Sequence, residues 1–380
     1  MALTFVPDSS FSLSGITAFT FGMTEQCNMR CLYCCYSGAY MGLRTHSSTT
    51  MSRTTLDKAI SLMCRTAHPA ESISLSFYGG EALLCLDDIE YAVRELKEIF
   101  GSRISFDIST NGLLLTHDSV SRICRLPDTG ISVSLDGCCS VHDRRRVGGD
   151  GSPTFAAIRQ NLLDFKQSYP EEYRKRIRLM ATFASLDELE EANGEYDAFS
   201  ELLGDKPPHV SRVMPNFRTG EYLPDTMVQK KTALATALQK RREGREDFHT
   251  MLLDDLTRKR RRKFGRHTEN GTIMLHTCLN TLGSIYVTAD GKLYPCEKFG
   301  TRYSIGDVDS GIDHVLLRKV VMTYTLRRQM LCRDCDVAEY CARCPADMKI
   351  SLTDMRRMCE DYRNDILNSI EFISDETGIQ

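Results

Sequence analysis

Three cysteines near the start of the chain follow one another at CxxxCxxC spacing, with an aromatic residue immediately before the third. They are Cys27, Cys31 and Cys34, and the aromatic residue is Tyr33. Thiolates are the usual ligands of iron–sulfur clusters, so these three could hold three irons of a [4Fe–4S] cube and leave the fourth open. A zinc site with Cys35 as fourth ligand is an alternative, as are three unrelated thiols. The spacing indicates a metal centre without deciding its metal.

A second group of cysteines lies in the last third of the chain. It comprises Cys278, Cys296, Cys332, Cys335, Cys341, Cys344 and Cys359. Nothing suggests secretion, so the clustered pairs among the 16 cysteines favour metal sites in a reducing cytosol over disulfides. One or two zinc sites are the alternative interpretation. Residues 289–292 predict a hairpin turn between strands at 284–288 and 293–295.

Three polar motifs follow apolar segments earlier in the chain, and each could contact a ligand. Gly79 and Gly80 would let the backbone approach a ligand closely, and the carboxylate of Glu81 could bind an ammonium group. The other two motifs supply short polar side chains that suit the hydroxyl groups of a ribose. These side chains are Ser109, Asn111, Ser134 and Asp136. Their Asn-Gly and Asp-Gly pairs also signal turns, and both roles are compatible.

The elements that must position these motifs repeat a strand-then-helix pattern over roughly the first half of the chain. The predicted strands are residues 16–23, 72–78, 104–109, 131–135, 177–183 and 210–214, and two of the predicted helices are residues 54–66 and 86–100. Strands that alternate with helices pair in parallel through right-handed crossovers. The sequence therefore predicts an α/β fold.

The CxxxCxxC octet, together with the Gly-Gly-Glu motif, resembles the signature of the radical S-adenosylmethionine (SAM) superfamily. The resemblance implies a partial (β/α)6 barrel of the TIM type, with catalytic loops at the carboxyl ends of the strands. It implies that SAM binds the open iron, and that one electron cleaves SAM to methionine and a 5′-deoxyadenosyl radical. The protein would position this cofactor and keep water and oxygen out.

The same resemblance assigns cofactor contacts to individual residues. The Gly-Gly-Glu motif would bind the amino group of SAM, the four short polar side chains would contact its ribose, and Tyr33 belongs to the cofactor-binding set. The stretch from His142 to Arg146 resembles an HDxxR motif of maturase members, which would place Arg146 near SAM. A solvated run of charge is the alternative interpretation of this stretch.

The C-terminal cysteines resemble the SPASM domain of radical SAM peptide and protein maturases. By this resemblance, one auxiliary [4Fe–4S] cluster is held by Cys332, Cys335, Cys341 and Cys359. A second is held by Cys278, Cys296 and Cys344, so we expect three [4Fe–4S] clusters in the chain. The match departs at one spacing, since two residues rather than three separate Cys341 from Cys344. The eighth cysteine of full SPASM domains is also missing. The fourth iron of the second auxiliary cluster would therefore stay open or take another ligand, such as His276 or water.

The resemblance divides the chain into a barrel at residues 1–217, a basic helical linker at 218–267 and a SPASM domain at 268–380. Net charge is −3 and no apolar run approaches the roughly 18 residues of a membrane span, so we expect a cytoplasmic protein. A signal peptide is not recognisable. The linker charge, densest at 258–263, could steer an acidic peptide or a nucleic acid. A solvated helix is the simpler interpretation, and the scarcity of aromatic residues argues against RNA.

Radical SAM enzymes with SPASM domains oxidise side chains of peptides or proteins. We therefore expect an enzyme that abstracts a hydrogen from a ribosomally synthesised precursor peptide and installs a thioether or carbon–carbon cross-link. Besides this peptide, the expected partner is an external electron donor such as flavodoxin or ferredoxin. Only 26 residues precede Cys27, too few for a winged leader-binding domain, so we expect the leader to be recognised by a separate leader-binding protein, by the linker or by the mouth of the barrel.

Two other functions stay open. One is formylglycine formation, as in anaerobic sulfatase maturases, where Glu297, directly after Cys296, would replace the family's catalytic Asp. Glu297 buried beside a cluster could have a raised pKa suited to proton transfer, or it could pair with Lys298. The other is a non-catalytic iron–sulfur or zinc scaffold that binds a peptide, which the intact CxxxCxxC and Gly-Gly-Glu motifs disfavour.

Overall fold

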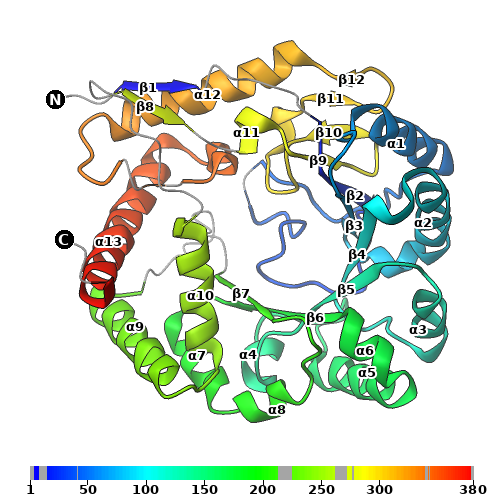
Figure 1. Ribbon diagram of the computed structural model, residues 1–380, viewed down its shortest axis with the longest axis horizontal. Coiled ribbons are helices and arrows are strands. Elements are labelled where there is room, and N and C mark those ends of the chain that lie inside the picture. The colour runs from blue at the N-terminus through cyan, green and yellow to red at the C-terminus, as the bar shows by residue number, and fades with distance from the viewer. Residues whose placement is uncertain are drawn as a thin grey trace.

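The computed structural model describes residues 4–7, 15–40, 42–212, 225–261, 272–275, 278–338, 341 and 343–377. Its main feature is a ten-stranded sheet with the order β12-β11-β10-β9-β2-β3-β4-β5-β6-β7. Neighbouring strands from β2 to β7 pair in parallel. Strands β12 and β7 form the two edges, so the sheet is not closed and the barrel is partial (Figure 1). The predicted α/β fold with a partial barrel is confirmed.

The six parallel strands lie where the apolar segments predicted them. They are β2 (Ala18–Thr24), β3 (Ile73–Gly79), β4 (Ile104–Thr110), β5 (Thr129–Ser134), β6 (Ile177–Phe183) and β7 (His209–Arg212). Buried and half-buried residues alternate along β6, as the two-residue period of a strand requires. Positions 213 and 214, the predicted end of the last strand, lie outside the described residues.

Helices connect these strands and cover the outer side of the sheet (Figure 1). They are α1 (Arg53–Thr66), α2 (Leu86–Phe100), α3 (His117–Cys124), α4 (Cys139–Asp143), α5 (Phe155–Ser168), α6 (Pro170–Arg176), α7 (Leu186–Asn193) and α8 (Tyr196–Ser200), with short 3₁₀ turns η1 (Ala82–Cys85) and η2 (Gly101–Arg103). Both helices for which bounds were predicted are confirmed. The Ser52 hydroxyl caps α1 by accepting a hydrogen bond from Thr55 N at 3.1 Å. In the part of the chain that the structure describes, no helix is long and apolar enough to cross a bilayer.

The predicted C-terminal hairpin is confirmed as β9 (Ser284–Val287) and β10 (Lys292–Tyr294), which pair antiparallel. Gly291 turns the chain with φ of 81°, a conformation that glycine adopts without strain. The surrounding elements are α11 (Cys278–Thr281), η3 (Thr301–Tyr303), β11 (Gly306–Asp307), β12 (Gly311–Ile312), α12 (His314–Cys332), η4 (Pro345–Lys349) and α13 (Leu352–Thr377). This region therefore consists of a small meander and two long helices.

Strand β9 also pairs in parallel with β2, so the C-terminal hairpin continues the barrel sheet. At the start of this ladder, the amides of Thr17 and Ala18 donate to the carbonyl of Gly283 at 3.1 and 3.0 Å. A separate two-stranded parallel sheet joins β1 (Thr4–Pro7) to β8 (Thr272–Leu275). Both ladders connect segments far apart in the sequence, which local patterns do not specify.

The loop that follows the cysteine motif packs on the same hairpin through Arg44. This side chain is 7% exposed, and its guanidinium lies 4.9 and 4.4 Å from the ring centroids of Tyr286 and Tyr294. Its Nη1 donates to the backbone carbonyls of Glu297 and Phe299 at 3.1 and 3.5 Å. Cation–π contacts and carbonyl dipoles thus replace an acidic partner for this buried charge. Arg44 joins the two cysteine-bearing regions.

The predicted linker helices are confirmed as α9 (Met227–Arg242) and α10 (Phe248–Arg261), and α9 lies beside α13 (Figure 1). Basic side chains of α9 pair with acidic residues: Lys230 with Asp365 of α13 at 2.8 Å, and Lys240 and Arg241 with carboxylates before and within α10. This pairing weakens the positive field expected from the linker. The side chains at 258–263 lie outside the described residues, and the three-domain division stays a prediction.

Replacing Arg44 with methionine should destabilise the junction between the cysteine loop and the hairpin. The change leaves two buried carbonyls without a donor, and each unsatisfied group costs about 1–3 kcal/mol. We expect the free energy of unfolding, from anaerobic urea titrations, to fall by about 2–4 kcal/mol. The matched control Arg302→Met, at an exposed position of η3, should change it by less than about 0.5 kcal/mol. Equal unfolding midpoints for the two variants would contradict the role assigned to Arg44.

Candidate functional site

The cysteine loop follows β2, and backbone hydrogen bonds to residues 145–149 fix its shape. The amides of Arg30 and Leu32 donate to carbonyls of this segment at 2.8 and 2.9 Å, and Gly149 N donates back to Asn28 O at 2.9 Å. The bonds have the antiparallel pattern of a short ladder. The loop is therefore held by a segment more than a hundred residues later in the sequence.

All three thiols of the loop accept hydrogen bonds. Backbone amides two residues farther along donate to Cys27 and Cys34 at 3.4 and 3.3 Å, and Arg146 Nη1 donates to Cys31 at 3.8 Å. Burial raises the pKa of Cys27 to about 11 and also raises that of Cys31. A buried thiol becomes a thiolate when it binds a metal, and N–H donors then stabilise the negative charge. These residues fit the open-iron cluster predicted for them.

Asp136 holds two other predicted site residues beside the loop. Its Oδ2 accepts from Arg146 Nε at 2.8 Å and from the Tyr33 hydroxyl, and its Oδ1 accepts from Thr182 N at 2.9 Å. The Arg146 guanidinium, 5.2 Å from the Tyr33 ring centroid, also reaches Cys31. Arg146 is buried and paired, so the solvated-charge interpretation is wrong for it. The oxygens of Asp136 orient protein groups, and its contact with a ribose stays a prediction.

Glu81 is fully buried just after the end of β3, beside the end of the neighbouring strand β4. Its oxygens accept hydrogen bonds from Leu83 N at 3.1 Å, from Thr110 Oγ1 at 2.7 Å and from Asn111 N at 2.8 Å. Burial raises the pKa of Glu81, and these donors oppose the rise. Asn111 in turn donates to Asn28 Oδ1 of the cysteine loop at 2.7 Å. The carboxylate thus fixes the strand ends under the loop, and its contact with the amino group of SAM stays a prediction.

Gly79 and Gly80 bring the end of β3 against the end of β2 and the start of the cysteine loop. A Cβ at Gly79 would lie 2.3 Å from Thr24 O, and one at Gly80 would lie 1.9 Å from Gln26 O. Gly79 also has φ of 131°, a conformation that L side chains rarely adopt. The amides of Gly80 and Glu81 donate to those same two carbonyls at 2.6 and 2.8 Å. The two glycines therefore allow a close approach between backbone segments of the protein itself, and their contact with a ligand stays a prediction.

Ser109 and Ser134 differ from the other members of the predicted ribose set. They stand at the ends of the adjacent parallel strands β4 and β5, at the same edge of the sheet, and both are half-buried. Within the described part of the chain, the side chains of Asn111 and Asp136 form hydrogen bonds, whereas neither serine hydroxyl does. Of the four side chains predicted to contact the ribose, those of the two serines are therefore the most available to bind a ribose hydroxyl group.

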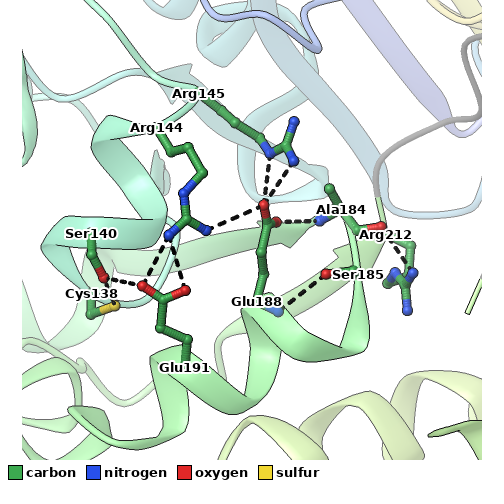
Figure 2. Close-up of polar contacts among 9 residues, drawn as sticks. All are labelled: Cys138, Ser140, Arg144, Arg145, Ala184, Ser185, Glu188, Glu191 and Arg212. Atoms are coloured by element: carbon green, nitrogen blue, oxygen red, sulfur yellow. Dashed lines mark hydrogen bonds and ion pairs between the residues drawn. The ribbon is translucent and has the colours of Figure 1, made fainter. Parts of the chain in front are cut away.

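Glu188 of α7 is a residue of the site that the sequence did not indicate (Figure 2). It is 6% exposed and accepts from Arg145 Nε and Nη2 at 3.0 and 2.7 Å and from Ala184 N at 2.8 Å. The carbonyl of Arg145 is the acceptor for Leu32 N in the cysteine loop. Glu188 therefore ties α7 to the segment that shapes this loop. An Arg and a Glu in separate elements carry no local signal of such pairing.

The four cysteines predicted to form the first C-terminal group influence one another electrostatically. Burial raises the pKa of Cys332 to about 11, Arg328 opposes the rise, and Cys341, Cys359 and Cys335 add to it. Their grouping and their binding of one cluster stay predictions.

The second group shows the same behaviour. Burial is the main cause that raises the pKa of Cys296, and Glu297, Cys344 and Cys278 raise it further. The charges of Cys278 and Cys344 thus act on Cys296, and the binding of a cluster by these three cysteines stays a prediction. His276, the suggested fourth ligand, lies outside the described residues.

Two buried arginines point at the first group. Arg328 and Arg343 are each 2% exposed, and their Nη1 atoms donate to Cys341 Sγ at 3.7 Å and Cys359 Sγ at 2.9 Å. Buried cations need anionic or dipolar partners, which thiolates supply. Arg328 also donates to the backbone carbonyls of Ala338 and Cys341, and Arg343 pairs with Asp347 at 3.4 Å. Among the described residues no group of three or more His, Cys, Asp or Glu is arranged to hold a metal ion. Thiols with nearby N–H donors are the groups that a thiolate cluster uses, and the cluster itself stays a prediction here.

Glu297 is half-buried and lies beside the segment after the cysteine motif, because its backbone carbonyl accepts a hydrogen bond from Arg44 Nη1 at 3.1 Å. Nearby Cys35, then burial, then Glu297 raise the pKa of Tyr78 well above its usual value. Cys35 Sγ lies 3.7 Å from the Tyr78 hydroxyl. Although burial opposes it, Glu297 also raises the pKa of Lys298. Both roles considered for Glu297, a base and a partner of Lys298, stay predictions.

Comparison with known proteins agrees with this geometry. The Radical SAM superfamily matches residues 22–170, and the iron–sulfur cluster-binding SPASM domain matches residues 278–345. A serine-type anaerobic sulfatase-maturating enzyme of Bacteroides thetaiotaomicron is 28% identical over 165 residues. That match spans 39% of this chain and 39% of the relative's length. The chain thus contains a Radical SAM domain followed by a SPASM domain.

Solved structures share the fold. Native anSMEcpe with bound AdoMet superposes with a TM-score of 0.69 at 17% identity, over 96% of this chain and 100% of that chain. Streptococcus suis SuiB bound to S-adenosylmethionine superposes with a TM-score of 0.53 at 14% identity, over 88% of this chain and 76% of that chain. SuiB bound to precursor peptide SuiA superposes with a TM-score of 0.50 at 13% identity, over 81% of this chain and 67% of that chain. The radical SAM and SPASM assignments establish SAM and [4Fe–4S] clusters as the cofactors, which replaces the zinc and non-catalytic interpretations.

Replacing Glu188 with glutamine should weaken SAM binding, because it removes the charge that anchors Arg145 beneath the cysteine loop. We expect the Kd for SAM to rise about tenfold, or about 1.4 kcal/mol. The electron paramagnetic resonance signal of the SAM-bound reduced cluster should also change. Iron content should stay at the wild-type level, which separates a positioning effect from loss of the fold.

Glu191→Gln is the matched control. Glu191 lies one turn farther along α7, is exposed, and pairs with Arg144 at 3.0 Å without reaching Arg145 (Figure 2). Its substitution should leave the SAM affinity and the spectrum unchanged. Wild-type behaviour of both variants would show that Glu188 does not position the loop.

Proposed function

We propose that this enzyme modifies a ribosomally synthesised precursor peptide and installs a thioether or carbon–carbon cross-link. The observation that carries the proposal is the position of Glu297 beside the segment after the cysteine motif, where Arg44 Nη1 donates to the Glu297 carbonyl at 3.1 Å. The pairing of β2 with β9 brings the barrel and the C-terminal hairpin together. A carboxylate next to the loop that would hold the hydrogen-abstracting centre supports the oxidation of a bound side chain.

The comparisons support a peptide or protein substrate. The curated relative is named for maturing a sulfatase, and one of the structural neighbours is a complex with a precursor peptide. An external electron donor, a separate leader-binding protein and a cytoplasmic location remain parts of the proposal. The neutralised basic side chains of α9 give no support to a nucleic-acid partner.

In the proposed reaction, different residues of the site have different roles. When bound, SAM and the clusters supply the radical that removes a hydrogen atom and take up the remaining electron. The hydroxyls of Ser109 and Ser134 bind and orient the ribose, while Asp136 and Arg146 keep the cysteine loop in place. The carboxylate of Glu297 accepts the proton that leaves the substrate as the new bond forms.

Formylglycine formation on a protein Cys or Ser is the second candidate. It is favoured by the sulfatase-maturating relative and by the position of Glu297 directly after Cys296. The carboxylate is retained in this chain, but glutamate extends it by one methylene beyond the Asp expected from the resemblance. A base of this kind serves both candidates, so the product has to decide between them.

The cluster assignment predicts a selective loss in Cys31→Ala. With dithionite and SAM under nitrogen, wild-type protein should form 5′-deoxyadenosine and the variant should form none. Iron should fall from about twelve to about eight atoms per chain, because only one of three [4Fe–4S] clusters is lost. The control Cys64→Ala, at an exposed position of α1, should keep both iron and activity. Wild-type 5′-deoxyadenosine from Cys31→Ala would refute the assignment.

The proposed base predicts that Glu297→Gln forms modified peptide at least about a hundredfold more slowly, the usual cost of removing a general base. Cleavage of SAM without peptide should be unchanged. The control Glu360→Gln, exposed on α13, should keep the wild-type rate. Mass spectrometry of the wild-type product tests the chemistry: a cross-link removes two hydrogen atoms, whereas formylglycine yields an aldehyde that reacts with a hydrazide. A hydrazide-reactive product would replace the first proposal by the second.

A further inference from the structure

Helix α12 exposes a row of apolar side chains along its outer face. Val315, Met322, Leu326 and Met330 are 77%, 43%, 59% and 63% exposed. Their spacings of seven, four and four residues place them on one side of a helix. Single exposed apolar residues are ordinary, but an aligned row along a whole helix is typical of a surface that meets another molecule.

The charged side chains exposed along α12 itself are basic. Arg318 and Lys319 are exposed, and no Asp or Glu occurs from His314 to Cys332, whereas the exposed Asp313 and Asp334 flank the two ends of the helix. Among the described residues, the ion pairs of basic side chains involve neither Arg318 nor Lys319. An apolar row with a basic rim at Arg318 and Lys319 complements an acidic partner.

The inner face of the same helix leads to the first group of C-terminal cysteines. Cys332 ends α12, and the buried Arg328 donates to Cys341 Sγ at 3.7 Å. A helix with its side chains is about 10–12 Å across. The outer face therefore lies about one helix diameter from the proposed cluster. Electron tunnelling weakens steeply with distance, so this is a short route from the surface to that cluster.

We propose that the outer face of α12 docks an acidic one-electron carrier protein. The carrier exchanges one electron at a time with the cluster proposed at Cys332, Cys335, Cys341 and Cys359. When the cluster is oxidised by one electron, the carrier is reduced by one, and no bond is made or broken. A small apolar centre with a charged rim suits the weak, transient complexes of electron transfer. The inference rests on the proposed auxiliary cluster.

The test uses the reconstituted full chain with a flavodoxin as the acidic probe. Calorimetry gives its Kd, and stopped-flow absorbance gives the rate of electron exchange with the flavin. The variants are Arg318→Glu/Lys319→Glu, which reverses the rim, and Leu326→Ser, which interrupts the apolar row. The matched control is Arg125→Glu/Lys175→Glu, exposed basic positions next to α3 and on α6, away from α12 (Figure 1).

Rim reversal should raise the Kd for flavodoxin at least tenfold at low salt and slow electron exchange by a similar factor. The loss should shrink as salt is added, because exposed charges are screened over about 10 Å at 0.1 M. Leu326→Ser should weaken binding at all salt concentrations. In the control variant, the Kd for flavodoxin and the rate of electron exchange should stay within twofold of wild type. SAM cleavage driven by dithionite should be unchanged in every variant.

Unchanged flavodoxin affinity and exchange rate in both α12 variants would overturn the docking site. A loss of peptide binding instead, or a wild-type dimer that Leu326→Ser dissociates in light scattering, would also overturn it by assigning the face to another occupant. Failure of dithionite-driven SAM cleavage in the wild-type protein would count against the proposed function itself. The two proposals therefore fail in distinguishable ways.

Discussion

Strand β2 is hydrogen-bonded along both edges, to β3 on one side and to β9 of the C-terminal hairpin on the other. A strand paired on both sides cannot shift its register without breaking two ladders. The cysteine loop starts where β2 ends, so its position relative to the other strand ends and to Glu297 follows from this double pairing. The barrel half of the site and the C-terminal half are thereby parts of one sheet.

Buried arginines place positive charge beside the cysteines in both halves of the site. Arg146 is paired with Asp136 and directed at a loop thiol, while Arg328 and Arg343 are directed at C-terminal thiols. Burying a guanidinium without a partner is costly, so each is informative about what the surrounding protein holds. Like Arg44, Arg328 and Arg343 also donate to backbone carbonyls. Arg343 in addition pairs with Asp347. Positive charge thus lies beside the thiols where thiolate clusters are proposed.

The structure shows what the predicted site residues contact within the protein, while their contacts with the cofactor stay predictions. Gly79 and Gly80 lie against the backbone at the end of β2 and the start of the cysteine loop. The oxygens of Glu81 and Asp136 accept hydrogen bonds from neighbouring strand ends. A buried carboxylate satisfies a backbone amide as readily as a ligand ammonium, so residue type alone does not decide between them.

The sequence by itself determined the alternation of strands and helices, the hairpin before Cys296 and the cysteine spacings, because these depend on local periodicity, turn chemistry and the ligand preferences of thiols. Only the tertiary structure decided the parallel pairing of β2 with β9, the anchoring of the cysteine loop by residues 145–149 and the link from Glu188 to Arg145. These contacts join residues distant in sequence. They form only when the whole sheet has assembled, since neither partner carries a local preference for the other.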